Sequence, residues 1–104
     1  MGWSALRLDS TDNVSVQDFY DVIVCSWGLP TWFGRNLDAL FDALGDLTMT
    51  PTVLVWSGLG QLADIDPELA GAVLDILRDA VGQAPAFAVI VRDDLGVSGF
   101  DGLL

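Results

Sequence analysis

Residues 52–56 read TVLVW, an apolar and β-branched run that directly follows Pro51. A second continuously apolar run, AFAVIV, occupies residues 86–91. Runs of this kind are typical of strands buried on both faces of a parallel sheet. We therefore expect two neighbouring parallel strands, joined by a right-handed crossover that contains a helix.

The segment between these runs has helical spacing. Asp66 suits the N-cap and Pro67 the first helical position, so a helix is predicted from there to about Val81. Its predicted inward face consists of Leu69, Ala70, Val73, Leu74, Leu77 and Ala80. Residues 57–65 are expected to form a loop or a single irregular turn.

The N-terminal part predicts a strand, a turn and a helix. Residues 3–8 (WSALRL) alternate tolerably, and a turn-rich segment, DSTDN, follows at 9–13. Ser15 and Asp18 form a capping-box pattern at the start of a helix that ends before Gly28. The apolar stripe of that helix is Val16, Phe19, Tyr20, Ile23, Val24 and Trp27.

A shorter helix is predicted over residues 36–44, with Gly45 just after its C-terminus. The resulting order is β-α-α-β-α-β, an α/β fold in which a small three-stranded parallel sheet packs against helices. We expect a single domain over residues 1–92 and a mobile C-terminal tail over residues 93–104.

The charge balance points to a protein partner. The 104-residue chain carries fifteen acidic side chains against four arginines, a net charge of −11, yet 52% of its residues are hydrophobic. Disordered chains combine high charge with low hydrophobicity, so this one is expected to fold. Four cations are too few for a nucleic-acid site, which neutralises phosphates with Lys and Arg. The charge favours a basic protein instead.

The chain lacks His and Lys, which removes the commonest general base, the commonest metal ligand and Schiff-base chemistry. Its single cysteine, Cys25, can form neither an internal disulfide nor a zinc site, and we interpret it as a solvated free thiol. We expect no metal and no cofactor. The lack of a signal-peptide pattern and of a membrane-spanning apolar run favours a cytoplasmic protein.

Two groups of acidic residues are not required by the predicted helices. Asp38 and Asp42 stand at i and i+4 on the short helix, where like charges repel. A second stripe lies on the long helix away from its core face: Glu68, Asp75 and Asp79. Most such stripes are simply solvated faces. The aromatic residues Trp32 and Phe33 next to the short helix favour a protein interface, although they could instead cover the core.

Other chemical interpretations are weaker. The two carboxylates of the short helix could form a hydrolase acid/base pair, but only Arg35 is close in sequence as an electrophilic partner. Residues 58–60 lack the third glycine of a dinucleotide-binding loop. The acids at 64–66 and 93–94 do not continue into a calcium-binding loop.

The segment LPTWFGRNLDALFDAL, residues 29–44, resembles the barstar family of intracellular ribonuclease inhibitors. The hallmark of that family is Leu-Pro, two aromatic residues, Gly, any residue, and then Asn-Leu-Asp-Ala-Leu-Trp-Asp. The resemblance extends loosely from residue 3 to about residue 91 and implies a three-stranded parallel sheet with helices packed on it. It also implies an inhibitor, not an enzyme, that binds one-to-one to a basic secreted ribonuclease of the barnase type. We expect the free chain to be a monomer.

The resemblance implies four partner-binding residues: Trp32, Asp38, Asp42 and Asp79. Asp42 would mimic a substrate phosphate among the target's cations, Asp38 would pair with a basic group, and Trp32 would cover the target's catalytic residue. Arg35, Asp46 and Asp75 are expected at the periphery of this surface. Gly34 and Asn36 are expected to shape the loop and the helix start.

The sequence departs from the family pattern at several positions. Phe41 stands in place of the usual Trp, Ala43 in place of a Cys, and Trp32 in place of a Tyr. Asp79 is shorter than the Glu expected there, and Gln83 lies near the place of a further acid. These departures leave open a second interpretation, in which the same scaffold neutralises another basic toxin, such as a deoxyribonuclease.

Overall fold

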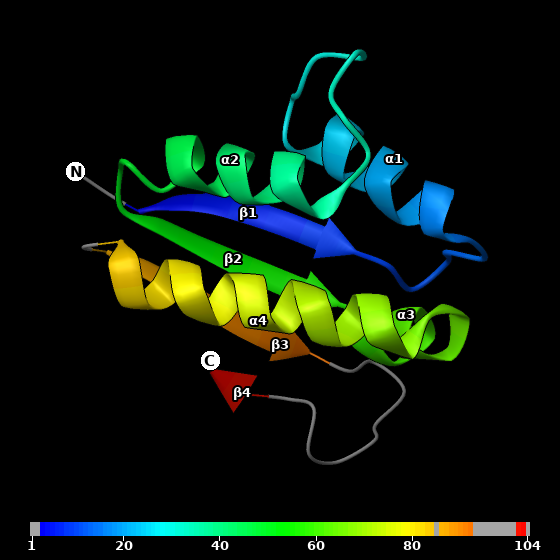
Figure 1. Ribbon diagram of the computed structural model, residues 1–104. Helices are drawn as coiled ribbons and strands as arrows, with labels where there is room; N and C mark the ends of the chain where they lie inside the picture. Colours follow the sequence, from blue (N-terminus) through cyan, green and yellow to red (C-terminus); the bar gives the residue numbers. More distant parts are fainter. Residues whose placement is uncertain (1–2, 85, 93–101, 104) are drawn as a thin grey trace.

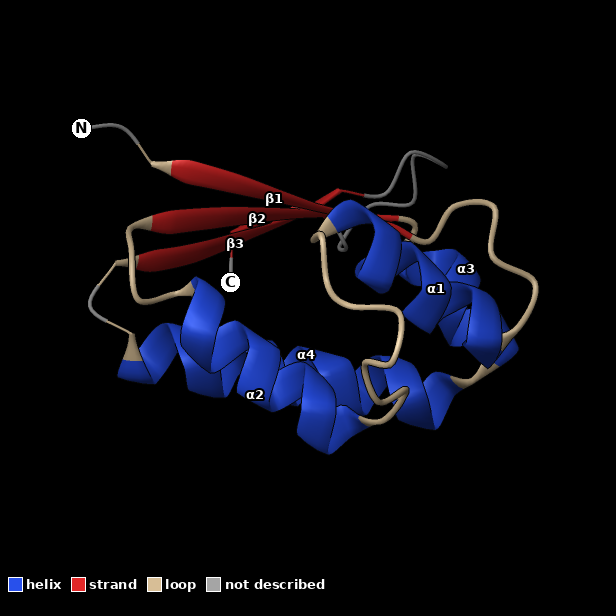
Figure 2. Cartoon of the chain, turned by 90° about the horizontal axis from the view of Figure 1, so that it is seen from above, coloured by secondary structure: helices blue, strands red, loops and turns tan. Residues whose placement is uncertain are grey.

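One sheet and one layer of helices make up the computed structural model, which describes residues 3–84, 86–92 and 102–103. The elements follow in the order β1 (Ser4–Asp9), α1 (Val16–Ser26), α2 (Leu37–Leu47), β2 (Thr52–Ser57), α3 (Leu59–Ile65), α4 (Pro67–Gln83), β3 (Phe87–Arg92) and β4 (Gly102–Leu103). Figure 1 and Figure 2 show the helices together on one face of the sheet. No helix within the described ranges is long and apolar enough to cross a bilayer.

The strands lie in the order β1-β2-β3-β4. β1, β2 and β3 are parallel to one another, so the predicted α/β fold with three parallel strands is confirmed. The structure adds β4, which pairs antiparallel with β3 and lies inside the segment 93–104 that was expected to be a tail. Residues 93–101 and 104 fall outside the described residues, so the expected mobility and domain boundary stay predictions.

The prediction that residues 52–56 are buried on both faces was wrong. In β2, Leu54 and Trp56 are fully buried under the helices, whereas Val53 and Val55 on the opposite face are only half-buried. Their neighbours across that open face are small or partly exposed, since Val53 lies beside Ala88 in β3. The apolar run therefore indicates a strand, but it does not indicate that a second layer covers the other face of the sheet.

The helix starts follow the predicted caps. Ser15 Oγ accepts a hydrogen bond from the Asp18 amide at 3.2 Å at the start of α1. Asp66 Oδ1 accepts one from the Leu69 amide at 3.0 Å, and Pro67 is the first residue of α4. These side chains satisfy amides that have no partner within the helix. The predicted starts of both helices are confirmed.

Two predicted boundaries were wrong. Residues 59–65 lie in the segment expected to form a loop or a single irregular turn, but they form the helix α3, which buries Leu59 and Leu62 against the core. The helix α2 also continues through Gly45 to Leu47. It ends at Thr48, whose amide and hydroxyl both donate to the Leu44 carbonyl, at 2.9 and 2.6 Å. A side chain that closes the helix C-terminus thus takes the place of the expected glycine.

A buried chain of hydrogen bonds links β1 to β2 at their carboxyl ends. The Trp56 indole Nε1 donates to Ser10 Oγ at 3.0 Å, and Ser10 Oγ in turn donates to the Gly58 carbonyl at 2.7 Å. Gly58 has a φ of 84°, and a Cβ there would lie 2.3 Å from the Thr11 amide nitrogen. Only glycine fits this position, because both the conformation and the space exclude a side chain.

Tyr20 packs on the same core and is only 4% exposed. Burial is the main cause that raises the pKa of its phenol above the ordinary value of 10.0, and the negative charge of Asp66 adds to it. The folded protein therefore favours the protonated phenol.

The substitution Gly58→Ala is expected to destabilise the fold by about 2–5 kcal/mol, because it adds left-handed strain to a clash with backbone. The matched control is Gly71→Ala in α4, where a Cβ meets nothing within 4 Å. That substitution should stabilise the protein by about 0.5–1 kcal/mol. Urea unfolding measures both, and similar effects at the two glycines would refute the role given to Gly58.

The unfolding free energy should fall as the pH rises above about 10, because the unfolded chain loses the Tyr20 proton at a lower pH than the folded protein does. Below that pH the contribution is fully present, and it is lost as the pH passes the raised pKa. The chain has no Lys or His and only one Tyr. In a Cys25→Ser background, Tyr20→Phe should flatten the alkaline limb between pH 9 and 11. An unchanged limb would contradict the assignment.

Candidate functional site

The loop between α1 and α2 stands out from the helix layer in Figure 1. It begins at Gly28, which has a φ of 67°, and it is held by hydrogen bonds from Leu29 to Val24 O at 3.0 Å and from Phe33 to Pro30 O at 2.9 Å. Trp32 lies in the turn closed by the bond from Phe33 to Pro30 and is 84% exposed, whereas Phe33 is half-buried. The loop thus presents one large aromatic side chain to solvent.

Arg35 fastens this loop to α1. Its Nε donates to Asp21 Oδ1 at 3.0 Å, and its Nη1 donates to the carbonyls of Phe33 and Thr31, at 3.0 and 3.3 Å. Gln17 also donates to Asp21 Oδ1 at 3.0 Å. The Arg35 charge, expected at the periphery of the surface, is therefore engaged within the loop. Asp21 was not identified from the sequence, since fourteen positions separate it from Arg35 and no helical spacing relates them.

The start of α2 is shaped by Asn36 and Gly34. Asn36 is the N-cap, and its Oδ1 accepts a hydrogen bond from the Ala39 amide at 2.8 Å. A Cβ at Gly34 would lie 2.9 Å from Asn36 Nδ2 and 3.3 Å from the Ala39 Cβ. Glycine lets the loop pass close to the cap, which is the structural part expected of both residues.

The outer side of α2 carries three exposed carboxylates, on Asp38, Asp42 and Asp46. The opposite side of the helix buries Leu40 and Leu44 in the core. Within the described residues, none of the three carboxylates lies within ion-pair distance of an arginine. The core therefore orients α2 so that the acids face solvent without an internal partner.

The acidic stripe of α4 is also exposed. Asp75 lies 3.7 Å from Arg78 in a solvent-exposed ion pair, and such pairs contribute little. Asp79 is exposed and has no arginine within ion-pair distance among the described residues. Figure 1 and Figure 2 show α4 beside α2 in the helix layer. The two helices that carry Asp42 and Asp79 are thus neighbours in the helix layer.

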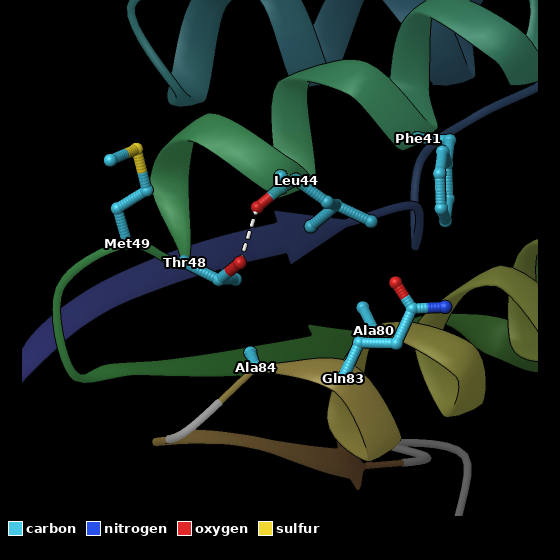
Figure 3. Close-up of a pocket in the computed structure, with 8 residues that line it drawn as sticks. Phe41, Leu44, Thr48, Met49, Ala80, Gln83 and Ala84 are labelled. Carbon is cyan, nitrogen blue, oxygen red and sulfur yellow. Dashed lines mark hydrogen bonds between the residues drawn. The ribbon is translucent and has the colours of Figure 1, made fainter.

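A hollow of about 250 Å³ lies between α2 and α4. Its lining consists of Phe41, Leu44, Gly45, Thr48, Met49, Ala80, Gln83 and Ala84. Figure 3 shows the Phe41 ring and the Gln83 amide reaching toward each other from the two helices, while Met49 points away from α4. The hollow has no signature in the sequence, because its walls come from helices that are separated along the chain by β2 and α3.

The described residues contain no group of three or more His, Cys, Asp or Glu side chains that could hold a metal ion. Cys25 is exposed on α1.

The exposed acids and the exposed indole form an open surface with charge on α2 and α4, and such a surface suits the binding of a cationic macromolecule.

Arg35→Met should loosen the loop while leaving the global stability within about 1 kcal/mol, because an exposed ion pair contributes little. We expect amide hydrogen exchange at Phe33 to be about tenfold faster, since the loop loses the bonds that hold it closed. Arg78→Met, which breaks the ion pair on α4, is the control and should leave Phe33 unchanged. Equal exchange at Phe33 in both variants would show that Arg35 does not hold the loop.

The comparison with known families agrees with this arrangement. The family model described as Barstar (barnase inhibitor) matches residues 3–93 of the chain. The match includes the exposed loop, α2 with its acids, and α4. The chain therefore belongs to the barstar family.

Proposed function

We propose that this protein is a one-to-one inhibitor of a basic ribonuclease and blocks the active site of that enzyme with acidic side chains. Membership of the barstar family supports a barnase-inhibitor-like role. The observation that carries the proposal is the exposed row of Asp38 and Asp42 on α2, which has no arginine partner among the described residues and directly follows a loop that exposes Trp32. Because the family is one of inhibitors, we propose no catalytic activity for this chain.

The chemistry follows from the exposed groups. A ribonuclease active site holds a phosphate with cationic side chains, and the Asp42 carboxylate offers such cations a charged acceptor in place of the phosphate. Asp38 lies one turn earlier on the same helix and is available to a neighbouring cation of the partner. Trp32 supplies a large flat surface with an N–H donor, a residue type enriched at interface centres.

The positive charge of Arg35 is paired within the protein, so it does not count against a basic partner. A free cation beside α2 would repel a basic partner, but the guanidinium is bound to Asp21 and to two loop carbonyls. The loop therefore presents Trp32 without offering an unpaired positive charge. Arg35 acts here by holding the loop in place, and Asp21 supplies its counter-charge.

The net charge of −11 supports fast encounter with a basic partner. Complementary fields raise association rates, and salt weakens them over a Debye length of about 8–10 Å at ordinary ionic strength. Charge pairs that lose their water in the complex govern its lifetime instead. We propose that the acidic residues that lie neither on α2 nor at the end of α4 act only through the long-range electrostatic field. We also propose that the free inhibitor is a cytoplasmic monomer.

The second candidate is a different basic toxin, such as a deoxyribonuclease. It is favoured by Gln83, whose neutral amide lies at the hollow between α2 and α4. A partner that meets an amide there needs a different side chain from one that meets a carboxylate.

Asp42→Ala should raise the dissociation rate from a basic ribonuclease of the barnase type at least tenfold. The loss of one partner from a desolvated charge pair costs about 2–5 kcal/mol, a range to which barnase and barstar themselves contributed. Glu68→Ala, at an exposed acid in the first turn of α4, should change mainly the salt-dependent association rate.

The wild-type chain should titrate the ribonuclease to a one-to-one endpoint in the inhibition assay, with a basic deoxyribonuclease as the parallel target. Equal effects of Asp42→Ala and Glu68→Ala on dissociation would refute the assignment to α2. Inhibition of the deoxyribonuclease alone would select the second candidate.

A further inference from the structure

We propose that the hollow between α2 and α4 receives one uncharged, apolar side chain from the surface of the basic protein partner. This inference rests on the proposed function and adds the chemistry of a specific contact. The hollow measures about 250 Å³, below the roughly 300–1,000 Å³ of typical small-molecule pockets, so it suits one large side chain.

The lining favours an apolar occupant. Phe41, Leu44, Ala80 and Ala84 supply apolar walls. The Thr48 hydroxyl already donates to the Leu44 carbonyl at 2.6 Å, and the remaining polar side chain is the exposed Gln83 amide. Among the residues that the structure describes, no charged side chain lines the hollow. A cation placed inside would lose its water and would find no carboxylate among the described lining residues. An apolar side chain, in contrast, is stabilised when it leaves water for an apolar site.

The surroundings identify the kind of partner. Asp42 follows Phe41 in α2, Asp46 follows Gly45, and Asp79 precedes Ala80 in α4, so carboxylates adjoin the lining residues on both helices. An occupant must therefore come from a surface whose neighbouring groups are cationic. A second copy of this chain does not qualify, because it also carries a net charge of −11. The hollow would form an apolar centre with a charged rim, the usual arrangement of a binding hot spot.

Gly45 and Gly71 provide matched variants for a test. A Cβ at either helical glycine meets nothing within 4 Å, but only Gly45 lines the hollow. Gly45→Met should occupy the hollow, and Gly71→Met should add the same side chain at an exposed site elsewhere. Thermal unfolding checks that both variants fold.

The first arm of the test is partner-free. N-acetylphenylalanine amide is titrated into the ¹⁵N-labelled chain, with N-acetylarginine amide as the charged alternative. We expect the phenylalanine amide to shift amide signals of residues 44–49 and 80–84 at millimolar concentration, in the wild type and in Gly71→Met but not in Gly45→Met. No saturable shift, an undiminished shift in Gly45→Met, or tighter binding of the arginine amide would overturn the inference.

The second arm measures ribonuclease inhibition. Gly45→Met should weaken binding at least tenfold, while Gly71→Met stays within twofold of the wild type. Normal inhibition by Gly45→Met together with loss of inhibition by Asp42→Ala would overturn the apolar contact and leave the proposed function intact. Binding of the phenylalanine amide by a chain that inhibits no ribonuclease would support the apolar hollow and overturn the proposed function.

Discussion

The hydrogen-bond chain from Trp56 through Ser10 to Gly58 is the constraint on which the rest of the structure depends. Trp56 is fully buried in the middle strand, so its indole N–H needs a partner inside the protein. Ser10 Oγ accepts that hydrogen bond and in turn donates one to the Gly58 carbonyl. This contact joins the ends of β1 and β2, and with them the segments that lead into α1 and α3. The two helices of the candidate site, α2 and α4, then pack over the same face of the sheet (Figure 2).

That one-sided packing separates the apolar and acidic parts of the chain. The inner sides of the helices fill the space over β1, β2 and β3, and the acids remain on the outer surface. Arg35 pairs with Asp21 and Arg78 with Asp75, so these two arginines are engaged away from the α2 carboxylates. A row of like charges costs some helix stability, by about 0.2–0.5 kcal/mol per i, i+4 pair. A cationic partner would convert this cost into attraction.

Local sequence patterns predicted much of the fold, but features that depend on contacts between distant segments could not be predicted. Ser15 and Asp66 were readable as helix caps because capping depends on residues three positions apart. The helix α3 was missed because its stability comes from burying Leu59 and Leu62 in the tertiary core. Gly45 looked like a helix end, but Thr48 closes α2 one turn later.

The candidate site divides in the same way. The exposure of Asp38, Asp42 and Asp79 followed from helical periodicity, since each lies away from its apolar stripe. The Arg35 contact with Asp21 depends on how the loop folds back on α1, and the hollow depends on the spacing of α2 and α4. Neither has a pattern in the sequence, because both arise from segments that meet only after folding.

The most direct measurement of the central claim is the surface that a basic ribonuclease covers on this chain. Amide hydrogen exchange of the isotope-labelled protein, with and without a saturating basic ribonuclease, maps that surface residue by residue. We expect protection over residues 31–46 and at the C-terminal half of α4, with no change on the open face of the sheet at Val53 and Ile90. Protection centred on that open face, with residues 31–46 unchanged, would contradict it.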